Sequence, residues 1–319
     1  MIHRLPIPTP FRVGRVNCHL IDDDPLTLVD VGPNWGVALV ALEDAVREAG
    51  RRLEDLERIV ITHQHADHVG LVGLVAEKSG AEVCALDAFA PLVEAFATYA
   101  DRNDELAQAV MRRHGVRDDV VTVLAAVTRA HRGWGGSAPV TQRLHDGGAL
   151  EFANRRFEVH HRPGHSPSDT ILFDPASGEL VAGDHLIKNI SSNPVISAPL
   201  DPDGERASAL LTYMASLRAT REMPIQTVLP GHGDTFGDHA TLIDERFAMH
   251  ERRAHKIAGL IAEQPLTAHE IAHSIWGGVA LTQTFLTLSE VLGHIDLLVE
   301  RGEVTEVPDE GVVRWTASK

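Results

Sequence analysis

The sequence predicts an α/β fold, in which short buried strands alternate with helices. Residues 37–49 carry apolar side chains at helical spacing and stop at Gly50, and residues 56–61 form an apolar run typical of a buried strand. Helical spacing returns over 71–78, and a strand pattern returns over 82–86. Because open α/β folds keep their sites at the carboxyl ends of the strands, we expect the site residues to follow the strands directly.

The chain is expected to open with a hairpin. Two β-branched and apolar runs, 11–21 and 26–31, are separated by the turn-forming residues 22–25. The second run ends at Asp30, just before Gly32. An acidic residue there could hydrogen-bond to a metal ligand or cap the turn.

Strands resume after a long helical segment. A strand is expected over 149–161, a hairpin over 170–173 and 180–182, and a further strand over 227–229. A glycine followed by a residue of a metal-binding type comes after three of these strands, in the pairs Gly164-His165, Gly183-Asp184 and Gly231-His232. Taken singly, each of these residues could be a loop or capping residue.

The densest cluster of such residues directly follows the strand 56–61. Thr62-His63-Gln64-His65-Ala66-Asp67-His68 places three imidazoles and one carboxylate within six residues. Without a nearby thiolate, these donors suit zinc, and also iron or manganese. Together with His165, Asp184 and His232, the cluster supplies seven ligand-type residues, enough for two adjacent metal ions.

The helical segment, residues 88–148, is interpreted as an insertion between two halves of the sheet structure. Such an insertion could act as a lid that supplies Tyr99 or Trp134 to a pocket, although residues of this type are more often core. Helices are expected over 91–101, 104–114 and 118–131.

Composition excludes several classes of protein. The 319 residues carry a formal net charge of -16, which disfavours a protein that binds by neutralising phosphates. The two cysteines, Cys18 and Cys84, lie in apolar runs and cannot form a cysteine-based zinc cluster. The start has no apolar segment of signal-peptide type, and no stretch has membrane-spanning length, so we expect a cytoplasmic protein without membrane contact.

The motif and the three later ligand positions resemble the metallo-β-lactamase fold superfamily of hydrolases, over about residues 1–240. The resemblance implies a four-layered αββα sandwich and two bound metal ions, expected to be zinc. It assigns His63, His65 and His165 to the first metal, Asp67, His68 and His232 to the second, and Asp184 to a bridging position. Asp30 matches the early aspartate of the family, a partner of the metal ligands.

With an aspartate at the bridging position, the ligand set resembles that of glyoxalase II, related thioesterases, lactonases and the nuclease branches. It differs from that of many true β-lactamases. Two close cations lower the pKa of a bridging water, so hydroxide forms without a protein base and can attack a carbonyl or phosphorus. Asp67 is the candidate catalytic residue, which would orient this nucleophile or relay its proton.

Residues 241–319 are expected to form a second, winged-helix-like domain. A helix to residue 262, a capped helix over 268–276, a third helix ending at Arg301, and a hairpin over 304–307 and 312–316 make up the pattern. The third helix carries Glu290, Asp296 and Glu300 against Arg301, a balance that repels nucleic-acid phosphates. We expect this domain to pack on the hydrolase domain and to shape its pocket or a homo-oligomer interface.

The preferred function is hydrolysis of a small-molecule thioester, ester or lactone, with an acyl thioester slightly favoured. The alternative enzyme function is cleavage of RNA or another phosphodiester by the same metal pair, and a non-enzymatic DNA-binding regulator is the third hypothesis. Lys188 could hold a substrate carboxylate or phosphate, but a surface lysine is commoner. His185 could be a partner of the metal ligands or a core histidine.

Overall fold

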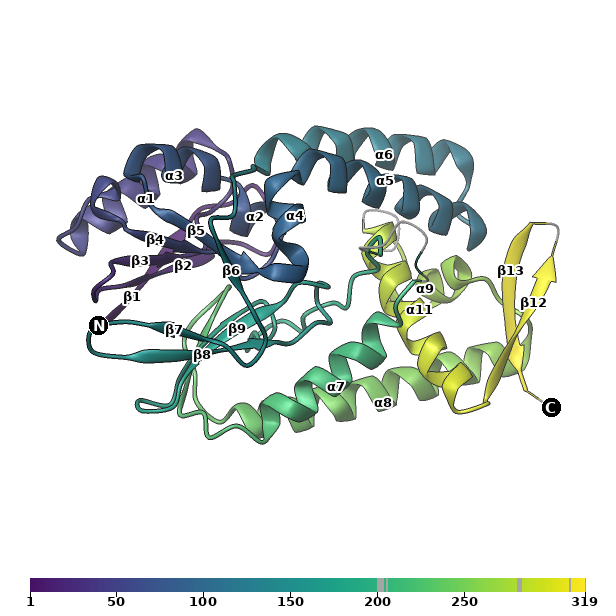
Figure 1. The fold of residues 1–319 in the computed structure, drawn as a ribbon. Helices are drawn as coiled ribbons and strands as arrows, with labels where there is room; N and C mark the ends of the chain where they lie inside the picture. The colour runs from purple at the N-terminus through teal and green to yellow at the C-terminus, as the bar shows by residue number, and fades with distance from the viewer. Residues whose placement is uncertain (200–203, 205, 280–282, 310, 319) are drawn as a thin grey trace.

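Two β-sheets lie face to face, with helices on both outer faces (Figure 1). The computed structural model describes residues 1–199, 204, 206–279, 283–309 and 311–318. The first sheet is ordered β1-β2-β3-β4-β5-β6, with β1 to β3 antiparallel and β3 to β6 parallel. Its strands are β1 (Ile2–Ile7), β2 (Val16–Ile21), β3 (Thr27–Val29), β4 (Arg58–Val60), β5 (Glu82–Leu86) and β6 (Gln142–Leu144).

The second sheet is ordered β11-β10-β9-β8-β7 and is antiparallel except for the β10–β11 pair. The stretch 149–161, predicted as one strand, is two antiparallel strands, because a turn at 152–155 reverses the chain. The strands of this sheet are β7 (Ala149–Glu151), β8 (Arg156–His161), β9 (Thr170–Asp174), β10 (Glu179–Gly183) and β11 (Thr227–Pro230).

The space between the sheets is filled by one face of each strand. Val29 and Val60 of the first sheet join Leu172 and Val181 of the second in one buried cluster. Their chain neighbours point to the opposite, helix-covered faces, as the two-residue period of a strand requires. The predicted α/β sandwich of four layers is therefore confirmed.

Helices α1 (Gly36–Glu48) and α3 (Val72–Ser79) cover the first sheet, whereas α7 (Ala209–Arg221) and the first turns of α8 (His239–Glu263) cover the second. Helix α7 and strand β1 had not been predicted from the sequence. Short helical turns lie at η1 (Leu53–Asp55), η2 (Asp87–Phe89) and η3 (Arg132–Trp134).

The helical insertion consists of α4 (Ala90–Glu94), α5 (Phe96–Arg113) and α6 (Asp118–His131). The predicted break between 101 and 104 is wrong. The polar residues there interrupt the apolar pattern but not the helix, because Asp101 and Asp104 both accept hydrogen bonds from Arg132. The insertion is also shorter than predicted, since β6 within 88–148 pairs with β5 as part of the first sheet.

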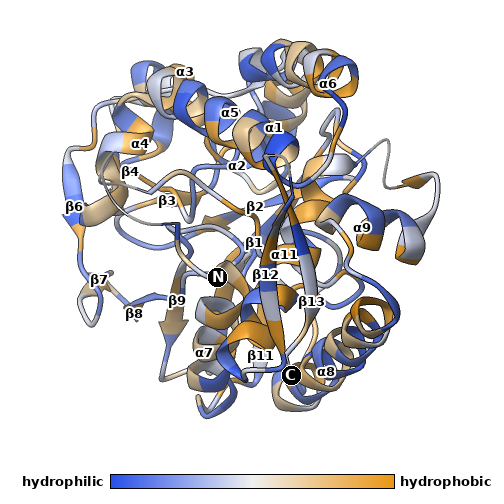
Figure 2. Cartoon of the chain, turned by 90° about the vertical axis from the view of Figure 1, so that its right-hand side faces the viewer, coloured by the Kyte–Doolittle hydropathy of each residue, from blue (hydrophilic) through white to orange (hydrophobic). Residues whose placement is uncertain are grey.

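The C-terminal part contains α8, α9 (Ala268–Trp276), α11 (Thr284–Glu300) and the hairpin β12 (Val304–Asp309) and β13 (Val312–Ala317). The predicted capping box of Thr267 and Glu270 at the start of α9 is confirmed. Figure 2 views the molecule from the side of this hairpin, with α8 and α9 beside it.

The insertion and the C-terminal helices share one apolar core. Val110 and Met111 of α5 and Val121 of α6 belong to the same buried cluster as Ile257 of α8 and Leu292 of α11. The domain boundary at residue 240 stays a prediction, and the structure puts that residue in the first turn of α8, which packs against both parts.

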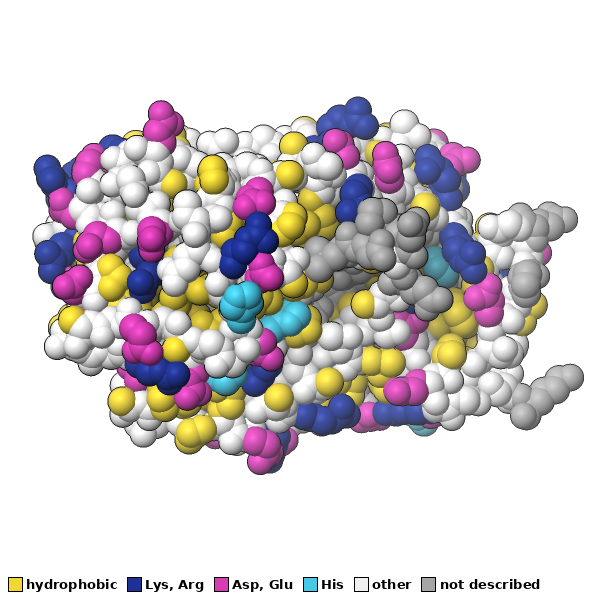
Figure 3. Space-filling model, in the orientation of Figure 1, with side chains coloured by type: hydrophobic (Ala, Val, Ile, Leu, Met, Phe, Trp, Pro, Cys, Tyr) yellow, Lys and Arg dark blue, Asp and Glu magenta, His cyan; other side chains and the backbone are white. Residues whose placement is uncertain are grey.

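The described surface mixes both signs of charge. Figure 3 shows Lys and Arg side chains interspersed with Asp and Glu over the face that it presents. Among the described helices, none is both long and apolar enough to span a bilayer.

Candidate metal centre

The seven predicted ligand residues meet where strands of the two sheets end. His63 and His65 follow β4, and the short helix α2 (Ala66–Val69) then presents Asp67 and His68. His165 lies in the loop after β8, Asp184 directly follows β10, and His232 lies two residues after the end of β11. Neighbouring strand ends therefore bring together residues that are far apart in the sequence.

The first group of ligand atoms consists of three imidazole nitrogens. Nε2 of His63 lies 3.0 Å from Nδ1 of His65, which lies 2.9 Å from Nε2 of His165. Three ring nitrogens that converge on one point form the donor set that zinc and similar cations prefer.

The second group consists of Asp67, His68 and His232. Nε2 of His232 lies 3.4 Å from Oδ2 of Asp67, and the ring of His68 stands 5.5 Å from the ring of His232. An imidazole pair with a carboxylate again supplies a cation-binding set.

Asp184 lies between the two groups. Its Oδ2 is 3.6 Å from Nε2 of His165 and 3.5 Å from Nε2 of His232, and its Oδ1 is 3.4 Å from Nε2 of His68. The close approach depends on Gly231, because a Cβ at that position would meet Asp184 Oδ1 at 2.2 Å.

Two buried atoms test whether these residues fit a metal. Nε2 of His68 and Oδ1 of Asp184 have no hydrogen-bond partner, although they face each other across 3.4 Å. Buried polar atoms are almost always paired, so two that converge without a hydrogen bond suit a shared cation. The residues therefore fit bound divalent metal.

Asp30 holds the second group in place through His68. Its Oδ2 accepts a hydrogen bond from Nδ1 of His68 at 2.7 Å, and its two oxygens accept from the backbone and side chain of Thr62. Asp30 has a φ of 59°, a backbone conformation that residues other than glycine seldom adopt. A strained residue that orients a ligand is typical of functional sites.

Backbone carbonyls orient two further imidazoles. Nδ1 of His165 donates to the carbonyl of Asn193 at 3.0 Å, and Nδ1 of His232 donates to that of Arg15 at 2.8 Å. With its proton on Nδ1, the neutral form of each ring directs the lone pair of Nε2 at the centre of the cluster.

The charge balance of the cluster leaves room for cations. Burial disfavours protonated His232, but Asp184 and Asp67 outweigh burial and raise its pKa to about 10. Likewise, burial opposes protonation of His68, yet Asp184, Asp30 and Asp67 raise its pKa well above the ordinary value. Without metal, these carboxylates attract protons onto the imidazoles, and bound metal cations would replace those protons.

The other predicted residues fall in different places. Tyr99 is buried and lines a cavity next to the cluster. Trp134 is not among the residues that line this cavity and stacks on His131 with ring centroids 4.7 Å apart. Lys188 is exposed and also outside the lining, and its backbone carbonyl accepts from Arg246. His185 hydrogen-bonds through Nε2 to Thr220 at 2.8 Å, so this bond goes to helix α7 and not to a ligand.

Gln64 was missed by the sequence reasoning. It lies between two ligand residues, its side chain accepts from Ser168, and it lines the same cavity as Tyr99. Its place inside the histidine motif was the available signal.

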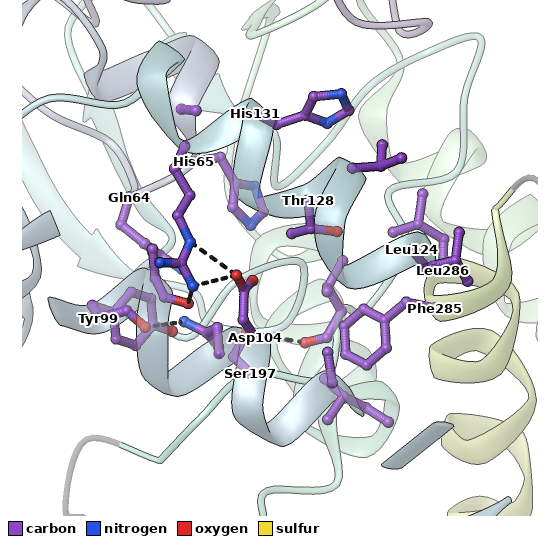
Figure 4. A pocket seen from close by; sticks show the side chains of 18 of the residues that line it. Gln64, His65, Tyr99, Asp104, Leu124, Thr128, His131, Ser197, Phe285 and Leu286 are labelled. Carbon is purple, nitrogen blue, oxygen red and sulfur yellow. Dashed lines mark hydrogen bonds and ion pairs between the residues drawn. The ribbon is translucent and has the colours of Figure 1, made fainter. Parts of the chain in front are cut away.

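The cavity has a volume of about 470 Å³ and lies between the insertion, the segment 195–197 and the start of α11. Figure 4 shows Gln64, His65 and Tyr99 on one side of it and Leu124, Phe285 and Leu286 on the other. A substrate in this cavity would reach the metal cluster through His65.

Comparison with known proteins identifies relatives over the whole chain. A family model described as the Metallo-beta-lactamase superfamily matches residues 11–232. The chain is 30% identical to the "Probable metallo-hydrolase YqjP" of Bacillus subtilis (strain 168), over 98% of this chain and 97% of that protein.

Two solved structures are similar in fold over nearly all of the chain. A metallo-beta-lactamase family protein from Thermus thermophilus has a TM-score of 0.81 and 26% identity, covering 99% of this chain and 98% of that one. A beta-lactamase domain protein from Burkholderia ambifaria has a TM-score of 0.83 and 27% identity, with coverage of 99% and 92%. The similarity therefore includes the C-terminal helices and hairpin.

Proposed function

The chain belongs to the metallo-beta-lactamase superfamily and is a metal-dependent hydrolase, and we propose that it cleaves a small-molecule thioester, ester or lactone. The observation that carries this proposal is the convergence of two ligand groups on a shared carboxylate, next to a cavity of ligand size.

We assign His63, His65 and His165 to one cation and Asp67, His68 and His232 to the other, with Asp184 between them. Two zinc ions are the first choice, and iron or manganese suit the same donors. Bound there, divalent cations supply an activated water at neutral pH and polarise the oxygen of the scissile bond.

The protein's own groups handle protons and orientation. The Asp67 carboxylate lies within the second group, where it can orient the attacking water and take up its proton. Asp30 keeps the ring of His68 fixed while this happens.

Tyr99 is proposed to contact the substrate. Its side chain is 6% exposed and its hydroxyl has no hydrogen-bond partner, although it lines the cavity beside Gln64 and His65. Burial raises the pKa of this phenol, while Asn103, Ser197 and Gln64 lie near enough to lower it in part. A buried phenol that stays protonated can donate to an oxygen of the substrate.

The alternative functions receive no comparable support. The one arginine among the described lining residues, Arg132, is already paired with Asp104 and Asp101, which does not suit an RNA backbone. Helix α11, which would enter a DNA groove, is the buried centre of the C-terminal core. A cytoplasmic location and a homo-oligomeric state stay predictions.

The test is purified, metal-loaded protein assayed against acyl-coenzyme A, acyl-glutathione, lactone and nitrophenyl ester panels, together with a labelled single-stranded RNA. We expect turnover of at least one acyl panel and none of the RNA. Turnover of none of the acyl substrates would overturn the proposal. RNA cleavage that is abolished by His63→Ala would establish the alternative instead.

The role of Tyr99 has its own test. Tyr99→Phe removes only the hydroxyl, so we expect kcat/KM to fall about tenfold while metal content stays unchanged. Steady-state kinetics and metal analysis of the same preparation measure both. Unchanged kcat/KM would remove Tyr99 from the substrate contacts.

A further inference from the structure

We infer that the cavity beside the metal centre binds an uncharged apolar acyl chain, with the scissile carbonyl at the His65 end. This inference rests on the proposed function and names the substrate class of that site.

The first observation is the change in polarity along the cavity. The end near the cluster carries Gln64, His65 and the unpaired hydroxyl of Tyr99. The opposite side carries the apolar side chains of Leu124, Phe285 and Leu286, with Thr128 beside them (Figure 4). A ligand with a polar head and an apolar body matches this order.

The second observation is the neutral balance of charge. Asp104 and Arg132 are the charged Asp, Glu, Lys and Arg side chains among the described lining residues, and they are paired with each other. Their side chains are only 12% and 22% exposed, and Nε of Arg132 lies 2.8 Å from Oδ2 of Asp104. A charged group on the acyl chain would find no free counter-charge among these residues. This disfavours a dicarboxylate or a phosphate inside the cavity.

The third observation is exposed apolar surface at the same place. Val127 on α6 and Leu286 on α11 both line the cavity, yet they are 46% and 41% exposed. An apolar chain between them would cover side chains that now face water, which favours binding by the hydrophobic effect.

Helix α6 offers a matched pair of test positions. Val123 lies one helical turn before Val127, is 62% exposed and does not line the cavity. Because both sites are exposed, Val127→Asp and Val123→Asp are expected to fold alike. Only the first introduces a charge into the cavity.

The experiment measures kcat/KM for nitrophenyl acetate, butyrate, hexanoate and octanoate. We expect a rise of about fourfold for each added methylene that the cavity covers. Val127→Asp should lower the octanoate value at least about tenfold, with a smaller loss on acetate, whereas Val123→Asp should leave the whole series unchanged. A flat series in the wild-type protein, or equal effects of the two variants, would overturn the inference.

A binding experiment separates this inference from the proposed function. Displacement of a fluorescent apolar dye by octanol and by butanol requires no hydrolysis. Octanol should bind more tightly than butanol to the wild-type protein and to Val123→Asp. Its affinity for Val127→Asp should be lower than its affinity for those two proteins. If that pattern holds while no ester is cleaved, only the proposed function fails; if octanol binds no better than butanol, the acyl-chain cavity fails even when short esters are cleaved.

Discussion

Two regions of the molecule collect histidines and carboxylates, and they differ in charge and surroundings. One is the candidate metal centre; the other is His250, Glu290 and His294, between helices α8 and α11. Both bring possible ligand atoms within 4.8 Å of one another. Proximity of ligand-type residues therefore does not by itself distinguish a metal centre from a polar group within a core.

The second cluster pairs most of its polar atoms, and its carboxylate, without a cation. Nδ1 of His294 donates to the backbone carbonyl of Glu290 at 2.7 Å, which leaves its Nε2 to accept from Nδ1 of His250 at 3.2 Å. Arg253 donates to the Glu290 carboxylate at 2.8 Å and so neutralises it. The unpaired Nε2 of His250 is on the other side of its ring from His294.

The candidate metal centre lacks such compensation. Asp30, Asp67 and Asp184 are buried around five imidazoles, and within the described part of the chain their ion-pair partners are histidines, not arginine or lysine. Uncompensated buried carboxylates favour bound cations, whereas a carboxylate held by arginine does not. Charge balance therefore separates the two clusters.

The largest expected effect is at Asp184. Asp184→Ala removes the carboxylate that both ligand groups share, so we expect bound metal to fall from the proposed two ions per chain to one or none. We expect kcat/KM to fall more than about 100-fold. Mutation of a residue that only hydrogen-bonds to a metal ligand already lowers activity by up to about 100-fold. Metal analysis and kinetics measure this, with the exposed Asp234→Ala as control. Retention of two metals would contradict the role of charge in separating the clusters.

The second cluster should matter for stability and not for metal. His294→Ala leaves Nδ1 of buried His250 without its acceptor and opens a cavity, so we expect a loss of about 2–3 kcal/mol in the free energy of unfolding. Urea unfolding measures it, and His255→Ala at an exposed position on α8 is the control. Metal content should stay at the wild-type value; loss of a metal ion would instead make this cluster a binding site.

Asp30 and Glu290 permit a matched test of the carboxylates. Asp30→Asn weakens the hydrogen bond that orients His68, so we expect metal affinity to fall about 10–100-fold. Glu290→Gln should leave metal affinity unchanged, because Glu290 pairs with Arg253. Competition with a chelator measures both variants, and equal losses would show that the contrast is mistaken.

The second cluster should make the folded protein less stable as the pH decreases. Burial is the main cause that lowers the pKa of His250 to about 3 and that of His294 to about 4, from 6.5. The unfolded chain therefore binds protons more readily, and stability falls as pH decreases from 6.5 toward 4. The slope is up to about 1.4 kcal/mol per pH unit for each histidine. His294→Ala should show a shallower slope in urea unfolding at several pH values, and an unchanged slope would exclude this assignment.

Local signals predicted much of the fold correctly. The capping box made the start of α9 predictable, and the apolar run 82–86 is β5 as expected. Helix α7 has Leu210, Tyr213, Met214 and Leu217 at helical spacing and could have been predicted from them. The break within α5 was wrong, because polar residues at 101–104 are held by Arg132 from a distant turn.

At the site, too, local patterns were predictable and distant contacts were not. The spacing of His63, His65, Asp67 and His68 predicted a metal-binding stretch, and a glycine before a ligand-type residue after three later strands predicted the three other ligands. Spacing could not show that Trp134 packs against Phe11 and His131, or that Lys188 lies outside the cavity. Side chains in long connections are positioned by contacts that sequence distance does not reveal.

The sequence by itself determined the alternation of strands and helices and the ligand types, because both depend on residues close together in the chain. Tertiary structure alone decided that Asp184 lies between two ligand groups, that α5, α6 and α11 enclose an apolar cavity, and which histidine cluster is charge-compensated. These features depend on the packing of elements far apart in the chain, where each contact reflects the whole fold and no local pattern.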